Sequence, residues 1–156
     1  MYSRILVPID GSETSNRGLA EAIQMAKLTG GRIKLLHVFD AQSLATYPMA
    51  DFSLTPDWWG LLKEAGESIL SAGRSVVQAA GVPVEAELRD GLALRVSDGV
   101  VAEAQRWAAD LVVLGTHGRR GVGRLLMGSD AEQIVRSSPV PVLLVRGSRG
   151  APAAAR

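Results

Sequence analysis

The sequence predicts a single α/β domain, built on a doubly wound, five-stranded parallel sheet of Rossmann-like type. Short apolar runs alternate with amphipathic helical patterns along the chain, as strand–helix–strand units require. With 156 residues, 47% hydrophobic and 21% charged, the chain is long enough for one well-buried domain and too short for two ordinary ones. We expect this domain to span residues 1–146, followed by a flexible tail at 147–156, which has nothing to pack.

The first half of the chain begins with a strand, a helix and a second strand. The strands should span residues 4–9 and 32–39, which are mainly apolar. The helix between them should begin at Ser12 or Glu13 and close at the Gly30–Gly31 pair. Its inward face recurs at helical spacing. This face consists of Leu19, Ile23 and Ala26.

The middle of the chain supplies a second helix and a third strand. A polar, proline-containing loop over residues 40–55 leads to a helix start at Pro56–Asp57. The expected inward stripe of this helix is Trp59, Leu62, Gly66, Ile69, Gly73, Val76 and Ala80. The third strand, residues 83–88, carries Glu85 and Glu87 on one face, which places it at an edge of the sheet.

The second half repeats the alternation. A third helix is expected over residues 92–108, with apolar residues spaced by four, four and three. These residues are Val96, Val100, Ala104 and Trp107. Residues 111–114 are apolar throughout, as a central strand should be. A short helix from Ser129 should end before Pro139, and residues 141–146 should form the fifth strand.

The order of the strands indicates where a ligand should bind. Right-handed crossovers and the burial patterns favour the order 3-2-1-4-5. Ligands of such sheets bind at the carboxyl ends of the strands where the chain direction reverses, here strands one and four. The loops at these ends are residues 10–12 and the glycine-rich segment 115–129.

The glycine-rich segment has the sequence GTHGRRGVGRLLMGS and precedes a predicted helix. Glycines let backbone N–H groups approach an anion, and a helix start adds unpaired N–H groups and the positive end of its dipole. Arg119, Arg120 and Arg124 make the segment basic, and no acidic residue occurs in it before Asp130. The segment therefore predicts a nucleotide ligand.

Other phosphate-binding classes fit less well. A P-loop requires Gly-Lys-Ser/Thr, but no lysine follows Lys63. A Rossmann fingerprint belongs after the first strand, whereas the Gly121/Gly123 pair follows the fourth. Receiver domains have an acidic pair after strand one and a lysine after a later strand, and neither is present. A glycine-rich turn that serves only tight packing remains the structural alternative.

The spacing Gly-x2-Gly-x9-Gly-Ser over residues 115–129 resembles the nucleotide-binding signature of the universal stress protein family, in its ATP-binding branch. Three further segments agree with the family in their order along the chain. They are VPIDGS at 7–12, LLHV at 35–38 and SPVPVLLV at 138–145. The resemblance covers residues 2–146 and implies a fold similar to the adenine nucleotide alpha hydrolases.

The resemblance implies ATP with magnesium as the ligand, and it implies contacts from loop residues and from the start of the last helix. These contacts are Pro8, Asp10, Val38 through its backbone to the adenine edge, Gly115, His117, Gly118, Arg119, Gly128, Ser129 and Asp130. A phosphate-bound magnesium ion would lie near Asp10 or Asp130. Helix capping or an Asx turn explains Asp10 equally well, and capping explains Ser129.

Asp130 departs from the family pattern, since many ATP-binding relatives carry an apolar residue after Gly-Ser. A carboxylate beside phosphates repels them unless a cation intervenes. An acidic residue in the first turn also interacts favourably with the helix dipole, which is the simpler explanation. Because of this carboxylate, we expect ATP binding to depend on magnesium more than in a relative with an apolar residue after Gly-Ser.

Several classes of function and location are disfavoured. The chain has no cysteine, so disulfides, thiol catalysis and thiolate metal sites are excluded. The net charge of +1 argues against a general nucleic-acid binder. No stretch reaches the roughly 20 apolar residues of a membrane span, and no signal-peptide pattern precedes residues 4–9. A cytoplasmic protein is expected.

The two histidines, His37 and His117, show no metal-ligand spacing. We expect His37 to be a strand residue and His117 a loop residue near the ribose or phosphates. Trp59 and Trp107 lie at helix-core spacings and should pack in the core.

The resemblance implies a nucleotide-dependent sensor or regulator of the stress response. The sequence shows no nucleophile motif and no base placed to activate water, so any ATP hydrolysis would be slow. Two alternatives stay open: a nucleotide-free, dimeric partner-binding module, and a slow ATP-hydrolysing enzyme of related fold.

The last strand also predicts a homodimer through residues 140–146. This strand is apolar but should lie at a sheet edge, where an unpaired strand invites pairing. The resemblance implies the same, since family members commonly dimerise through their last strand. In the alternative, Pro139 and Pro141 protect the edge, because they lack an N–H group, and the chain is monomeric.

Overall fold

The computed structural model describes residues 1–39, 58–90, 95–116 and 127–147. Within these residues, five parallel strands form one sheet in the order β3-β2-β1-β4-β5, which confirms the predicted order. The strands are β1 (Arg4–Pro8), β2 (Arg32–Phe39), β3 (Val84–Asp90), β4 (Leu111–Gly115) and β5 (Val142–Val145). The helices are α1 (Glu13–Thr29), α2 (Trp58–Ala79), α3 (Val96–Arg106) and α4 (Ser129–Ser137).

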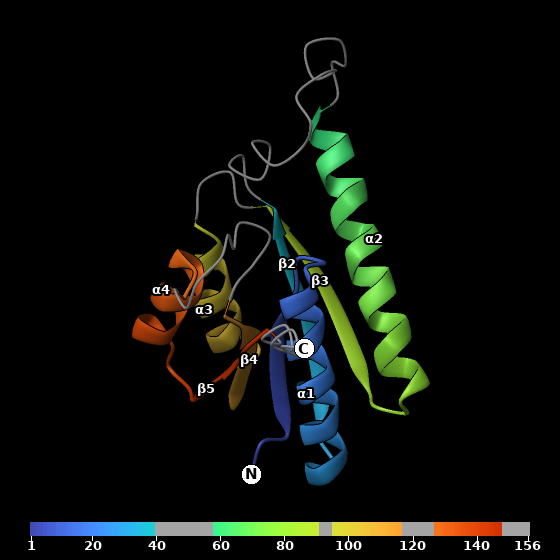
Figure 1. Cartoon of the computed structure of the whole chain (residues 1–156), viewed down its shortest axis with the longest axis vertical. Coiled ribbons are helices and arrows are strands. Elements are labelled where there is room, and N and C mark those ends of the chain that lie inside the picture. Colours follow the sequence, from blue (N-terminus) through green and yellow to red (C-terminus); the bar gives the residue numbers. More distant parts are fainter. Residues whose placement is uncertain (40–57, 91–94, 117–126, 148–156) are drawn as a thin grey trace, which may run out of the picture.

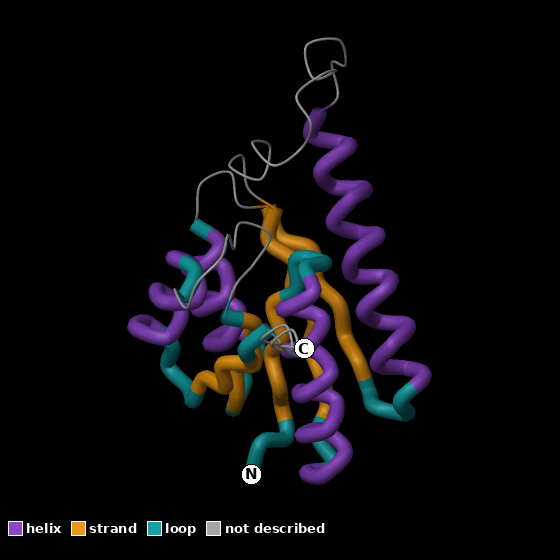
Figure 2. Tube along the Cα trace, viewed as in Figure 1, coloured by secondary structure: helices purple, strands orange, loops and turns teal. Residues whose placement is uncertain are grey.

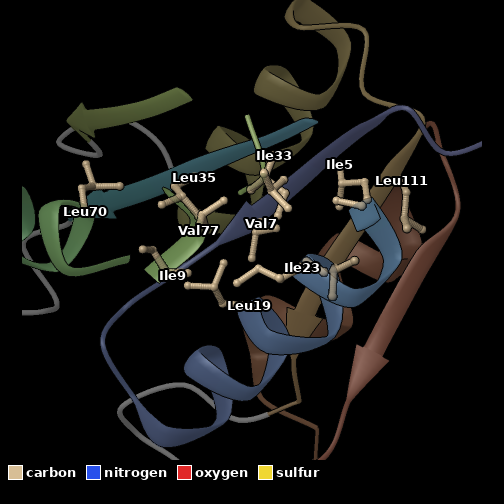
Figure 3. Packing of buried hydrophobic residues seen from close by; sticks show 14 residues of the cluster. Ile5, Val7, Ile9, Leu19, Ile23, Ile33, Leu35, Leu70, Val77 and Leu111 are labelled. Atoms are coloured by element: carbon tan, nitrogen blue, oxygen red, sulfur yellow. The ribbon is translucent and has the colours of Figure 1, made fainter. Parts of the chain in front are cut away.

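The helices form two layers, one on each face of the sheet (Figures 1 and 2). α1 and α2 cover one face, and α3 and α4 cover the other. Because side chains alternate along a strand, β1, β2 and β4 contribute apolar side chains to both layers. The layer under α1 and α2 includes Ile5, Val7, Ile33, Leu35 and Leu111, which meet Leu19, Ile23, Leu70 and Val77 from the helices (Figure 3). The opposite layer includes Leu6, Leu36, Val112, Val100, Trp107 and Ile134.

The ends of α1 are set by local sequence, as predicted. Ser12 is the N-cap, and its side-chain oxygen accepts the Ser15 N–H over 3.2 Å. Gly30 ends the helix in the left-handed conformation, with φ of 67°, and its N–H donates to the Ala26 carbonyl. The chain therefore enters and leaves α1 in fixed directions.

The buried face of α2 differs from the predicted stripe. Val76 was expected inside but is 55% exposed, and Leu70 and Val77 are buried instead. The predicted stripe repeats every seven residues, and such a repeat drifts by about 20° per heptad on a straight helix. Over a helix of 22 residues, this drift moves Val76 off the seam. Trp59 is half-buried and contacts Phe39, with ring centroids 4.7 Å apart.

Several predicted boundaries also shift. β1 ends at Pro8 rather than at residue 9, α3 ends at Arg106 rather than at residue 108, and β5 spans Val142–Val145 rather than 141–146. β3 extends to Asp90, because this residue still pairs with Phe39 of β2. α3 begins at Val96, and the preceding residues 91–94, which the prediction included in part, lie outside the described residues. Of the expected tail, residues 148–156 also lie outside them.

A cluster of charged side chains lies between β2, β3 and α3. The Lys34 Nζ is 2.6 Å from Glu103 Oε1 and 2.8 Å from Glu87 Oε2. Arg89 and Arg106 each place a guanidinium nitrogen 2.7 Å from Glu103 Oε2, and the Glu103 side chain is fully buried. Burial alone would lower the pKa of Lys34, but its two carboxylate partners outweigh burial and raise it. The cluster fixes edge strand β3 and helix α3 to the rest of the sheet.

No helix in the described ranges combines the length and the apolar composition that crossing a membrane requires.

Candidate functional site

The candidate site lies at the carboxyl ends of β1 and β4, which are neighbours in the sheet. The chain leaving β1 enters α1 on one face, and the chain that follows β4 reaches α4 on the opposite face. This divergence is the topological switch point of a doubly wound sheet. The described parts of the two loops predicted from the sequence therefore meet at one edge.

The turn after β1 is held by its own side chains. The Asp10 carboxylate accepts the Ser12 N–H over 2.9 Å, which forms an Asx turn. Ser15 is buried, and its hydroxyl lies 3.4 Å from the Asp10 nitrogen and 3.1 Å from the Ser12 carbonyl oxygen. Asp10 itself is half-buried. An ionised carboxylate accepts several hydrogen bonds at once, so the structural role of Asp10 is compatible with binding a ligand.

The end of β4 packs tightly against the first turns of α1. A Cβ atom on Gly115 would lie 2.7 Å from the Thr14 carbonyl oxygen, and one on Gly18 would lie 3.3 Å from the Gly115 nitrogen. Position 115 thus requires glycine for packing alone, and Gly18 lies in a tight contact with Gly115. Tight packing alone, the alternative to phosphate binding, is therefore sufficient to explain the glycine at position 115.

Gly128 is different, because the fold leaves room for a side chain there. The nearest atom to a Cβ on Gly128 would be the Thr116 carbonyl oxygen at 3.6 Å, an ordinary contact. The backbone angles, φ −60° and ψ 150°, are open to any residue. Neither packing nor backbone conformation in the described residues demands glycine at this position.

Gly128 is also the N-cap of α4, and a glycine has no side chain with which to make a capping hydrogen bond. The N–H groups of the first turn, residues 129–131, have no acceptor within the helix. Together with the positive end of the helix dipole, such N–H groups bind anions. Ser129 is exposed and Asp130 is half-buried in this turn.

Val38 lies near the end of β2, and its side chain is buried. It packs against Gly99 of α3, where an added Cβ would lie 3.2 Å from Val38 Cγ2. The backbone direction of Val38 follows from its neighbours. The Arg32 N–H donates to Ser3 and the Leu36 carbonyl accepts from Ile9, each over 2.9 Å, so even-numbered residues of β2 face β1. The N–H and C=O groups of Val38 therefore face the turn that follows β1.

The structure thus places six predicted contacts, together with Val38 on β2, at the carboxyl edge of the sheet. Pro8 is the last residue of β1, Asp10 is in the following turn, Gly115 ends β4, and Gly128, Ser129 and Asp130 begin α4. His117, Gly118 and Arg119 lie outside the described residues, as do Arg120 and Arg124. In the described part of the chain, no three His, Asp or Glu side chains are grouped so that they could hold a metal ion.

Two residues at this edge were not singled out as site residues from the sequence. Thr14 contacts Gly115, a packing partner distant in the sequence that no local pattern reveals. His37 was predicted to be a strand residue, which is confirmed, but its ring also reaches the Ile9 carbonyl oxygen over 2.7 Å.

Comparisons with known proteins agree with this architecture. A family model described as the universal stress protein family matches residues 1–146. Universal stress protein MJ0531 of Methanocaldococcus jannaschii is 31% identical over 147 residues, which cover 94% of this chain and 83% of that protein. A universal stress protein of Thermus aquaticus, from the QAH/OAS sulfhydrylase 3′ region, is 32% identical over 94% of this chain and its own full length.

Solved structures show the same fold. Hypothetical protein MJ0577 superposes with a TM-score of 0.80 at 25% identity, covering 96% of this chain and 99% of that one. A universal stress protein solved in complex with cAMP gives a TM-score of 0.69 at 27% identity, covering 94% of this chain and 99% of that one.

Proposed function

The chain belongs to the universal stress protein family, and we propose that it binds ATP and acts in the cytoplasm as a nucleotide-dependent sensor or regulator of the stress response. The structural neighbour solved with cAMP, at 27% identity, supports an adenine nucleotide as the ligand. The spacing of glycines over residues 115–129 supports a ligand that carries phosphates.

The observation that carries the proposal is the glycine at position 128. A glycine that the fold does not require lowers the stability of the folded state, because glycine loses more backbone freedom on folding than other residues. The described fold has room for a Cβ there and imposes no unusual φ. Close approach of a phosphate to the start of α4 would account for a glycine at this position, which packing in the described residues does not require.

The remaining contacts follow from position. The Asp10 carboxylate, after β1, would accept hydrogen bonds from the ribose hydroxyls, and the Val38 backbone would meet the adenine edge. The N–H groups of the first turn of α4, with the Ser129 hydroxyl, would hold phosphate oxygens. Pro8, Gly115, His117, Gly118 and Arg119 complete the proposed set, and the positive charge of Arg119 would balance phosphate charge.

Magnesium fits this set of donors. Asp10, Ser129 and Asp130 offer carboxylate and hydroxyl oxygens, which are the ligands that Mg²⁺ prefers. Because no acidic cluster suited to a metal occurs in the described residues, the ion would be held largely by the phosphates, with Asp10 or Asp130 beside it. A bound ion would neutralise phosphate charge next to Asp130. We assign no catalytic residue, and we expect any hydrolysis to be slow.

The free edge of β5 supports a homodimer through residues 140–146. The Pro141 and Val145 carbonyls accept hydrogen bonds from Val112 and Thr116, so odd-numbered residues of β5 face β4. Val142 and Leu144 consequently direct their N–H and C=O groups to the open edge. Pro141 is odd-numbered, so it does not remove a donor from this edge, and Pro139 lies in the bend that precedes the strand. The same strand of a second copy could therefore pair with this edge.

The direct test is to identify what the protein binds when it is purified. The protein is denatured, and the released small molecules are examined by ultraviolet absorption and mass spectrometry. We expect an adenine nucleotide in amounts approaching one per chain, or saturable binding of added ATP with magnesium. A protein that releases no nucleotide and also fails to bind ATP in equilibrium dialysis would favour the nucleotide-free dimeric module.

A further inference from the structure

His37 lies in β2 with a buried side chain, and its Nδ1 atom is 2.7 Å from the carbonyl oxygen of Ile9. A carbonyl oxygen only accepts hydrogen bonds, so Nδ1 carries the proton and donates. Ile9 directly precedes Asp10. The imidazole therefore ties the start of the β1–α1 turn to the neighbouring strand.

This hydrogen bond takes the place of the next backbone hydrogen bond that a continued ladder between β1 and β2 would form. The Ile9 N–H donates to the Leu36 carbonyl over 2.9 Å, which is the last step of the ladder on the β1 side. In a regular parallel pair, the next step would be donation from the Val38 N–H to the Ile9 carbonyl. The His37 side chain supplies the donor to that carbonyl.

We propose that His37 is a positioning residue for nucleotide binding, which ends the β1–β2 ladder at Ile9. By donating to the Ile9 carbonyl, it keeps the Val38 N–H directed toward a ligand, and it fixes the turn that carries Asp10. The inference rests on the ATP site proposed above. The buried His37 side chain would set the distance between the Val38 backbone, which would bind the adenine, and the Asp10 carboxylate, which would bind the ribose.

The fold makes room for this ring by placing a glycine against it. A Cβ on Gly66 of α2 would lie 2.8 Å from His37 Cδ2 and 2.6 Å from Leu88 Cδ1. Gly66 is buried. The ring is thus confined between β2 and α2, and a larger residue at position 66 would force it to shift from its present position.

The test compares two replacements of His37. Asparagine carries an N–H donor close to the place of Nδ1, whereas leucine fills similar space without one. We expect H37L to weaken ATP·Mg²⁺ binding about tenfold, the equivalent of one hydrogen bond, and H37N to stay within about threefold of wild type. Val77→Ala, on the buried face of α2, is the control for lost stability alone and should keep wild-type affinity.

A second measurement reports on the position of Val38 itself. By amide hydrogen exchange, ATP·Mg²⁺ should increase protection of the Val38 N–H in the wild type and in H37N, but not in H37L. If H37L does not fold, Gly66→Ala displaces the ring without removing its donor and should give the same loss of affinity and protection.

Three results are decisive. A folded H37L that binds ATP as tightly as the wild type overturns the inference, and so does a Val77→Ala variant that loses affinity equally. If the wild type itself does not bind ATP, the proposed function is overturned together with this inference. The titration of the wild type alone reveals that result.

Discussion

The backbone N–H of Gly128 donates a hydrogen bond to the carbonyl oxygen of Thr116 over 2.9 Å. This bond joins the end of β4 to the start of α4 across the glycine-rich segment. Thr116 is anchored in turn, because its own N–H donates to Val145 of β5 over 2.9 Å. The N–H groups at the start of α4 are therefore held in place before a ligand arrives, which reduces the entropy lost on binding.

Substitutions at Gly115 and Gly128 should separate packing from binding. We expect Gly115→Ala to lower the free energy of unfolding by about 1–3 kcal/mol, because its Cβ would clash with backbone and side-chain atoms of Thr14. Gly128→Ala should cost less, at most about 1 kcal/mol, because alanine is a poorer N-cap than glycine. Urea denaturation followed by circular dichroism measures both, and equal stability losses would contradict the distinction drawn here.

Asp130 should make ATP binding depend on magnesium. Its carboxylate lies in the first turn of α4, beside the proposed phosphate position. Without a bridging cation it would repel the phosphates, so we expect Asp130→Ala to bind ATP better than wild type in the presence of a chelator. Titrations with magnesium and with chelator measure the effect. If the two proteins show the same magnesium dependence, Asp130 serves only the helix dipole.

The order of the sheet was predictable because its signals are local and repeated. The apolar runs 32–39 and 111–114, bounded by helical patterns, leave few possible topologies once right-handed crossovers are required. The error at Val76 has a physical origin, since a seven-residue stripe drifts along a helix of 22 residues. The end of β3 depended on pairing with Phe39, a contact that no local pattern specifies.

The candidate site was predictable only as a set of positions. The glycine spacing indicated residues 115–129, but it did not reveal that Gly115 is required by Thr14 while Gly128 is not required by any described neighbour. The contact between His37 and Ile9 was equally hidden, because it joins residues 28 positions apart. Such contacts arise from the three-dimensional arrangement of elements.

The edge strand β5 should pair two copies of the chain. We expect the wild type to be a dimer at micromolar concentration, and Val142→Lys or Leu143→Lys to shift it to monomers, because a buried lysine in the pairing surface is costly. Val135→Lys, at an exposed apolar position on α4, is the matched control and should remain dimeric. Light scattering after size exclusion measures the mass. A monomeric wild type would end this proposal.

The protein should become less stable at acidic pH, because the Glu87 carboxylate becomes protonated. Burial alone would raise the pKa of Glu87, but hydrogen bonds from Lys34 and Arg89 and the nearby positive charges lower it from 4.5 to about 2. A carboxyl whose pKa is lower in the folded state stabilises the fold above its unfolded pKa. This contribution is lost as the pH falls from 4.5 toward 2.

The variant Glu87→Gln isolates this effect. It should be less stable than wild type at about pH 7, and the difference should narrow at about pH 3, where wild-type Glu87 begins to lose its advantage. Urea midpoints at the two pH values measure the difference. A gap of constant size would show that Glu87 does not contribute through its charge.

The central claim, that the start of α4 binds the phosphates of ATP, is tested most directly by calorimetric titration with ATP·Mg²⁺. Three proteins are compared: wild type, Gly128→Val, and Arg136→Ala at the far end of the same helix, where the side chain is exposed. We expect saturable binding by wild type and Arg136→Ala, and at least a tenfold loss of affinity, about 1.4 kcal/mol, for a folded Gly128→Val. Unaltered ATP affinity in a folded Gly128→Val would contradict the claim.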